Sequence, residues 1–235
     1  MRIARIASWT HKWLTLIVGV QIVFWVVSGL FFTLIPIEQI RSEHVVRAVA
    51  PAPLEAETLG ELGALRGPQG EAPTKLTIER RDGRLIALAA FAEAAPALYD
   101  AQTLELLSPL SEEAAVAAAR AHVTLESPPT GVRRVVEASP EYGGPLPAYR
   151  VQFKEAGLAV YVAENTGEAQ ARRSDMWRIY DTLWALHIMD WRDHEDFNHP
   201  LIIATTALTL IAVLAGVALF PYRLVRRGGR VRPRP

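Results

Sequence analysis

The chain has 235 residues, of which 50% are hydrophobic, and its 25 Lys and Arg residues are balanced by 25 Asp and Glu residues. This composition excludes a disordered acidic or basic tail protein, because such chains lack the apolar residues that a packed core needs. The sequence contains no cysteine, which excludes disulfides, iron–sulfur clusters, thiolate zinc sites and covalently attached haem. Any cofactor must therefore be held by histidine, carboxylate or backbone groups.

Two long runs without charge predict transmembrane helices at residues 13–37 and 200–222. At about 1.5 Å per residue, each run is long enough to cross the roughly 30 Å hydrocarbon core of a bilayer. The second run begins with Pro200, and proline is well tolerated at the first position of a helix.

Basic residues flank both runs and set the expected orientation. They lie in residues 1–12 and residues 223–235, and these two segments are therefore expected in the cytoplasm. The stretch between the spans is then expected on the outer side, which in a bacterium is the periplasmic face of the inner membrane. The flanking residues are Arg2, Arg5 and Lys12 before the first span, and Arg223, Arg226, Arg227, Arg230, Arg232 and Arg234 after the second.

A cleaved signal peptide is the alternative interpretation of the first 37 residues. Its apolar region is usually 7–15 residues long, about half the length of the run seen here. The nearest Ala-x-Ala, Ala48 to Ala50, lies well beyond the run and is followed by Pro51. These features favour a retained membrane anchor.

Residues 38–73 are rich in Pro, Gly and Ala and are predicted as a linker that contains a short helical pattern at 57–65. A folded domain is expected over residues 74–175. It opens with alternating polar and apolar residues at 75–80 and a second apolar run at 84–90, which an Asp-Gly turn joins into a hairpin. A third short strand is expected at 97–100.

Ser111 is predicted to cap a helix that ends near His122, with two glutamates in its first turn. Three more strands are expected at 132–137, 148–154 and 158–163. The middle strand alternates cleanly, so one face of its sheet should be buried and the other exposed to water.

Two stretches of the predicted domain resemble each other at a spacing of about 63 residues. Residues 98–107 and 161–170 carry an aromatic residue, an acidic residue and Thr at matching places, and each follows a helix and strands. Each unit alone would have a small core, so pairing the two is physically reasonable.

Residues 176–199 come before the second span and begin with an amphipathic pattern at 176–188. Trp177, Tyr180 and Trp184 share one helical stripe with His187, and Trp and Tyr are enriched at the membrane–water interface. A helix lying on the outer bilayer surface, or leading into it, is therefore expected.

Three motifs resemble the PepSY-associated transmembrane family. The first span opens with a His-Lys-Trp-Leu motif and later carries Ser-Gly, the exported unit closes with a strand and an acidic Thr-Gly turn, and a Leu-His pair precedes the final span. These are residues 11–14, Ser28-Gly29, residues 160–168, Leu186-His187 and Gly216.

The resemblance implies a membrane α+β protein in which two transmembrane helices flank a periplasmic α+β domain of PepSY-like helix-plus-antiparallel-strand units. Larger members of the family have four or more spans and include iron-siderophore reductases thought to hold b-type haem on histidines. This chain has two predicted spans, so the fold and topology carry over more directly than reductase activity.

Three histidines are candidate haem ligands: the resemblance suggests His11 and His187, and His44 is a candidate because it lies near the outer end of the first span. His11 lies at the cytoplasmic end of the first span, and the matching end of the second span contains no histidine, so it would need a partner in a dimer or another subunit. The alternative is an interfacial residue that anchors the helix. His187 would meet His44 or His199 near the outer surface, or would simply pack on its helix.

A cluster before the second span combines imidazole and carboxylate groups that suit a divalent ion. Its candidate metal ligands are Asp190, Asp193, His194 and His199. The two histidines are five residues apart, which does not match the spacing of four in zinc proteases. A solvated acidic cap on the second span is the alternative.

No sequence motif of a hydrolase, a nucleotide-binding loop or a dinucleotide fold appears. The sequence therefore favours a binding or accessory subunit, or a regulator, of a larger inner-membrane assembly. The alternative is a haem b-bearing component of an iron or siderophore reductase. The expected partners of the chain are the lipid bilayer and another membrane protein or a second copy, contacted through the transmembrane helices, and not nucleic acid. The small-residue pairs Gly29/Thr33 and Ala212/Gly216 would either pack the two spans together or recruit such a neighbour.

Overall fold

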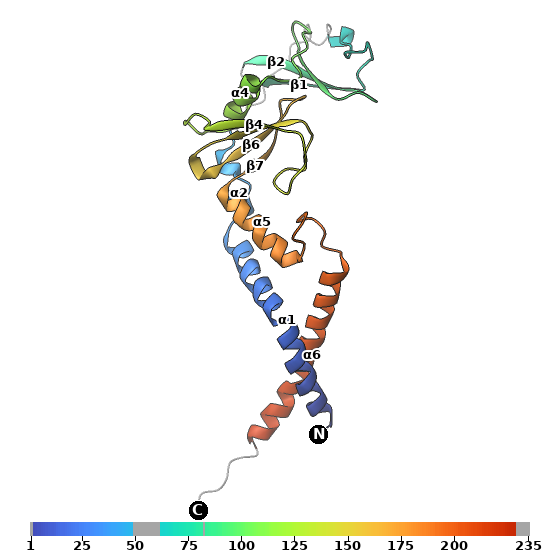
Figure 1. The fold of residues 1–235 in the computed structure, drawn as a ribbon, viewed down its shortest axis with the longest axis vertical. Coiled ribbons are helices and arrows are strands. Elements are labelled where there is room, and N and C mark those ends of the chain that lie inside the picture. Colours follow the sequence, from blue (N-terminus) through green and yellow to red (C-terminus); the bar gives the residue numbers. More distant parts are fainter. Residues whose placement is uncertain (1, 49–61, 82, 229–235) are drawn as a thin grey trace, which may run out of the picture. The chain divides into compact units, whose positions relative to one another are not determined.

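The computed structural model describes residues 2–48, 62–81 and 83–228 (Figure 1). The chain divides into two compact units, one formed by residues 1–36 with 179–235 and the other by residues 37–178. The first unit is helical and the second contains all the described strands.

The helical unit contains two helices that are long and apolar enough to cross a membrane. They are α1, Arg2–Leu34, and α6, Pro200–Gly228, and their apolar parts run over Ala4–Leu34 and Pro200–Pro221. The prediction of two long apolar helices is confirmed. Helix α1 begins at Arg2 rather than near Trp13, because the helical backbone continues through the polar residues that precede the apolar run.

Helices α1 and α6 pack against each other, and the start of α1 lies at the same end of the unit as the end of α6 (Figure 1). Nδ1 of His11 lies 2.8 Å from the main-chain oxygen of Ala212. A Cβ atom added to Gly216 would come within 2.9 Å of the same imidazole ring. The small residues of α6 therefore make room for His11, whereas a Cβ on Gly29 would meet nothing within 4 Å.

Helix α5, Asp175–Ile188, matches the predicted amphipathic helix. Its first four residues belong to the second unit and the rest to the helical unit. In the helical unit, the ring of Phe32 on α1 lies 4.9 Å from the ring of Tyr180 and 6.2 Å from that of Trp184, measured between centroids. The aromatic stripe of α5 therefore packs against α1.

The second unit begins within the predicted linker. Helix α2, Ile37–Ile40, is followed by two 3-10 turns, Glu43–Val45 and Leu62–Ala64. Ile40, Leu62 and Leu65 are buried, so these parts of the range 38–73 belong to the folded unit. Residues 49–61, which include most of the predicted helical pattern at 57–65, lie outside the described residues.

The first sheet is an antiparallel meander of β1, Lys75–Arg81, β2, Arg84–Ala90, and β3, Ala97–Asp100. These three strands confirm the predicted hairpin and third strand. A single bridge between Tyr99 and Leu106 extends the sheet beyond β3.

Helix α4, Glu112–His122, begins as predicted, with the Ser111 hydroxyl accepting a hydrogen bond of 3.2 Å from the N–H of Ala114. A second antiparallel sheet follows in the order β4-β5-β6-β7. The sequence did not indicate β7, because its Gln and Arg residues lack a clear apolar alternation. The strands are β4, Gly131–Val135, β5, Ala148–Gln152, β6, Ala159–Ala163, and β7, Ala169–Arg173, with a 3-10 turn at Glu155–Gly157.

The second unit is layered. Helix α4 lies between the two sheets (Figure 1), and its Ala115 and Ala119 share one core with Ile86 of the first sheet and Val151 of the second. Leu62 and Leu65 cover the other face of the first sheet. The layers therefore follow one another as a short helical segment, the first sheet, helix α4 and the second sheet. This alternation of helical and strand layers is consistent with the predicted repeat of a helix followed by strands.

Candidate functional site

The outer face of the second sheet, opposite the face that packs on α4, is partly covered by the loop 136–147. Ser139 and Tyr142 exchange backbone hydrogen bonds of 3.0 and 2.8 Å, which closes a tight turn in this loop. The Tyr142 ring is buried and stacks on Tyr161 of β6, with 4.6 Å between centroids and 5° between planes. This packing fixes the loop on the sheet and places Glu141 above it.

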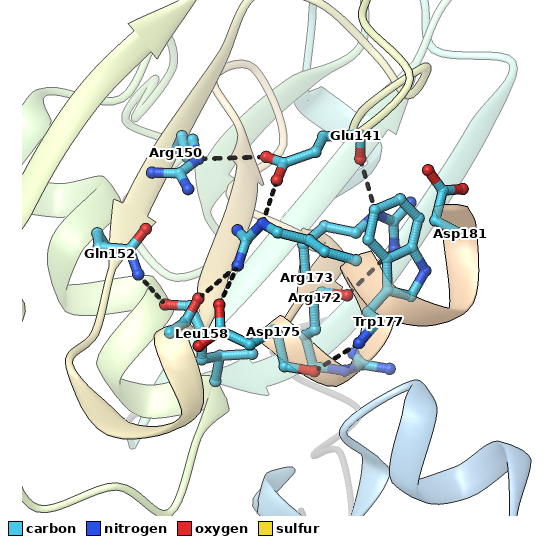
Figure 2. Close-up of polar contacts among 12 residues, drawn as sticks. Glu141, Arg150, Gln152, Leu158, Arg172, Arg173, Asp175, Trp177 and Asp181 are labelled. Atoms are coloured by element: carbon cyan, nitrogen blue, oxygen red, sulfur yellow. Dashed lines mark hydrogen bonds and ion pairs between the residues drawn. The ribbon is translucent and has the colours of Figure 1, made fainter. Parts of the chain in front are cut away.

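The carboxylate of Glu141 is the centre of a polar cluster (Figure 2). The Tyr161 hydroxyl donates to Oε2 over 2.6 Å, and Nε of Arg178 donates to Oε1 over 2.5 Å. Nε of Arg150 lies 3.6 Å from Oε2, and Nε of Arg173 donates over 2.7 Å to the main-chain oxygen of Glu141. Residues from the loop, β5, β6, β7 and α5 thus meet at one point.

This environment shifts the pKa of the central groups. Burial alone would raise the pKa of Glu141, but hydrogen bonds from Tyr161 and Arg178 and the charges of Arg178 and Arg150 outweigh it and lower that pKa. Burial, with the hydrogen bond to Glu141, raises the pKa of Tyr161 to about 12. At neutral pH the cluster therefore holds a carboxylate and a neutral phenol.

A shallow pocket of about 470 Å³ opens beside Glu141. Arg133 of β4 and Arg150 of β5 line it and are direct partners across the antiparallel pair. Direct partners project from the same face of a sheet, and like charges in such positions repel each other. The remaining lining residues are Gly131, Val132 and Gln152.

Both arginines keep hydrogen-bonding capacity for a ligand. Arg150 uses Nε for the Tyr161 hydroxyl, at 3.2 Å, and for Glu141, and no described residue accepts from its two Nη groups. Arg133 is exposed and makes no hydrogen bond or ion pair with a described residue. A guanidinium group carries five N–H donors in a planar fork that suits carboxylate and phosphate oxygens.

The described lining of the pocket carries more positive than negative charge. Arg133 and Arg150 line it together with one carboxylate, that of Glu141. Glu141 satisfies the inner arginines, while the Arg133 and Arg150 side remains open to the pocket. The arrangement is therefore suited to binding an anionic group.

The sequence indicated only part of this site. The clean alternation of β5 predicted that Arg150 and Gln152 lie on the wet face, and the structure confirms this. Glu141 could not be found in this way, because it lies in a loop without periodicity. The aromatic pair Tyr142 and Tyr161 that positions it comes from residues 19 positions apart in the chain.

His187, a predicted ligand candidate, lies between α5 and α1. Its Nδ1 is 2.6 Å from the hydroxyl of Ser28, and its main-chain oxygen accepts from Nε1 of Trp25 over 2.6 Å. Nε2 of Gln21 donates over 2.9 Å to the oxygen of Leu186. These side chains satisfy carbonyl groups that the end of a helix leaves without partners.

The two span-associated candidates, His11 and His187, do not fit as the axial pair of one haem within a chain. His187 lies beside Ser28, which is 17 residues along α1 from His11, or about 25 Å of helix. The ring of His187 also packs among Trp25, Phe32 and Trp184. The third candidate, His44, belongs to the other unit.

Three of the four candidate metal ligands, Asp190, His194 and His199, are engaged through their side chains in holding the segment before α6. Nδ1 of His194 pairs with Asp181 at 2.7 Å, and Nε2 of His199 lies 3.0 Å from the oxygen of Ile188. Asp190 accepts hydrogen bonds from backbone N–H groups, including those of Asp193 and Glu195. Among the residues that the structure describes, no three His, Asp or Glu side chains come together in a group suited to a metal ion.

Comparison with known proteins identifies no relative. No family model matches the chain, no curated protein matches it and no solved structure matches it. What the chain does must therefore be inferred from its own residues and their geometry.

Proposed function

We propose that this chain is a membrane-anchored binding protein, which acts as an accessory subunit or regulator of a larger membrane assembly. In this proposal, α1 and α6 anchor it in the bacterial inner membrane with both ends in the cytoplasm. The unit of residues 37–178 is then periplasmic and carries the binding site. The two long apolar helices and the basic flanks support this topology.

One observation carries the binding site: Arg133 and Arg150 are direct partners on the outer face of the second sheet, where both line the pocket. Two like charges in direct register destabilise a sheet, and no described carboxylate is bonded to Arg133. An anionic group bound between the two guanidinium groups would turn this repulsion into two charge-assisted contacts.

The ligand we propose is a carboxylate-bearing segment of a partner protein. The pocket is shallow and open, so it suits a side chain presented by a larger partner better than a small molecule that must be enclosed.

A defined probe tests this site on the full chain in mild detergent. A short fluorescein-labelled peptide of alternating Glu and Thr is titrated, and its binding is followed by fluorescence anisotropy. The same peptide with Gln in place of Glu is the ligand control. We expect the Glu peptide to bind more tightly, and its binding to weaken as salt is raised.

Variants assign the binding to the pocket. Arg133→Gln and Arg150→Gln should each weaken binding of the Glu peptide about tenfold, because each removes a charge-assisted contact. Arg84→Gln changes an exposed arginine of the first sheet and is the matched control. Equal binding of the Glu and Gln peptides, or an equal loss in all three variants, would contradict the proposal.

A further inference from the structure

A second pocket in the unit of residues 37–178 has a volume of about 490 Å³. Its apolar walls come from Val45, Leu125, Leu158 and Met176. Pockets of this size that combine apolar walls with a few polar groups are typical of small-ligand sites. The polar lining residues are Gln39, Ser42, His44, Glu155 and Ser174.

Ser42 is the most informative of the polar residues. It is 3% exposed, and its hydroxyl makes no hydrogen bond with another described residue. The hydroxyl oxygen is not among the fully enclosed side-chain atoms that lack a partner, so solvent or a bound molecule can reach it. Because Ser42 lines the pocket, its hydroxyl is available to a molecule bound there.

Two opposite kinds of polar group line the pocket. Gln39, Ser42 and His44, from the segment after α1, can all donate hydrogen bonds. Glu155, from the turn between β5 and β6, is the carboxylate among the described lining residues. A hydrogen bond from Ser127 lowers the pKa of Glu155, which keeps it ionised at neutral pH.

We infer that this pocket binds a phosphoethanolamine group, with the phosphate on the donors of Gln39, Ser42 and His44 and the ammonium on Glu155. A group with an anionic end and an N–H-bearing cationic end matches the two kinds of lining residue. The apolar residues accommodate the carbon chain between and beyond these ends.

The position of the pocket in the chain indicates a lipid as the source of this group. Gln39 follows the end of α1 by five residues, and Met176 is the second residue of α5. Five residues of chain span at most about 18 Å, so a bilayer crossed by α1 would have its headgroups within reach. This step rests on the membrane anchoring proposed above, whereas the chemistry of the pocket does not.

The lipid arm of the test uses the full chain in nanodiscs that contain equal amounts of phosphatidylethanolamine and phosphatidylcholine. The chain is then released from the nanodiscs in the mass spectrometer, and native mass spectrometry counts the lipid molecules that remain bound to it. Phosphatidylcholine has the same phosphate, but its trimethylated nitrogen cannot donate a hydrogen bond to Glu155. We expect phosphatidylethanolamine to be retained about tenfold more than phosphatidylcholine.

Glu155→Gln should abolish this preference, and Ser42→Ala should reduce retention of both lipids. Glu105→Gln, at an exposed position in the segment after β3, should leave the preference unchanged. Thermal unfolding of each variant shows whether it is folded, so a loss of binding is interpreted only for variants that unfold like the parent chain.

The soluble arm titrates phosphoethanolamine and phosphocholine into the detergent-solubilised chain by calorimetry. Binding of phosphoethanolamine without a lipid preference would support the site and assign it to a soluble ligand. No binding of phosphoethanolamine together with equal retention of both lipids would overturn the inference. Failure of membrane anchoring would appear separately, as recovery of the chain in the soluble cell fraction.

Discussion

Nε2 of His122, at the end of α4, lies 2.9 Å from Nη1 of Arg172 on β7. Arginine stays protonated and donates, so this imidazole nitrogen must accept and carry no proton. Arg47 lies at the same junction, where its main-chain N–H donates a hydrogen bond of 2.9 Å to the main-chain oxygen of His122. Nε of Arg172 also donates to the oxygen of Arg41, so His122 joins α4 and β7 to the segment that follows α1.

This junction predicts a loss of stability in mild acid. Burial, and then the charge of Arg172, lowers the pKa of His122 below its ordinary value near 6.5. In the unfolded chain His122 takes up a proton as pH falls below about 6.5, whereas in the folded chain it does not. Stability should therefore be unaffected by this group above pH 6.5 and should decrease between about pH 6.5 and the lower folded pKa.

The measurement is thermal unfolding of the full chain in mild detergent at pH 7.5 and 5.5, followed by tryptophan fluorescence. His122→Gln keeps an acceptor for Arg172 but cannot be protonated, so its unfolding temperature should change less between the two pH values. His44→Gln, at an exposed position, is the control. The same pH response in His122→Gln as in the parent chain would rule out this junction as its source.

The Glu141 cluster should contribute measurably to stability. Glu141→Gln removes the charge that Arg178 and Arg150 contact, and we expect the free energy of unfolding to fall by about 1–2 kcal/mol. Since the folded pKa of Glu141 is lowered, its contribution is present above about pH 4.3 and is lost as pH falls through the folded value. Thermal unfolding at pH 7 and pH 3.5 checks both points.

Two further variants separate the cluster from a general effect of charge. Glu137→Gln changes an exposed carboxylate of the same loop and should have little effect. Tyr161→Phe removes the hydroxyl that donates to Glu141, and combined with Glu141→Gln it should destabilise less than the sum of the two single changes. Additive effects would show that the two groups do not act together.

Because Arg133 and Arg150 repel each other, we expect that removing one of them stabilises the fold but weakens binding of the peptide. Without a ligand, Arg133→Gln should raise the unfolding temperature by about 1–2 °C, because it removes a like-charge pair in direct register. The same variant should bind the Glu peptide more weakly. A variant that loses both stability and binding would instead show that Arg133 has a structural role.

The segment before α6 should depend on one carboxylate. Hydrogen bonds from backbone N–H groups lower the pKa of Asp190 to about 2, and the largest effect comes from the N–H of Asp196. The other donors are the N–H groups of residues 192, 193 and 195. Asp190→Asn should weaken these hydrogen bonds and speed hydrogen exchange of those amides about tenfold. Asp193→Asn is the control, and equal exchange in the two variants would contradict this role.

The same pKa gives the expected pH dependence of this segment. Because the pKa of Asp190 is lowered, its stabilising effect is complete above about pH 4 and is lost between there and about pH 2. Hydrogen exchange measured at pH 5 and at pH 3, and corrected for the intrinsic rates, should show this loss in the parent chain and not in Asp190→Asn.

Local patterns in the sequence were enough to predict most elements of the fold. Long uncharged runs marked α1 and α6, the period of two marked β1 and β5, and Ser111 marked the start of α4. These features depend on neighbours one to four residues away, which a sequence displays directly. Strand β7 was missed because its burial depends on the strand beside it rather than on its own composition.

The candidate sites depended on contacts between distant residues. The period of β5 indicated that Arg150 would face water, but only the packed sheet brought Arg133 beside it and folded the loop so that Glu141 reaches Arg150. Likewise, the sequence marked His187 as a ligand candidate, while the packing of α5 on α1 decided that it meets Ser28. Residue types and periodicity determine which side chains are available, and tertiary packing determines which of them meet.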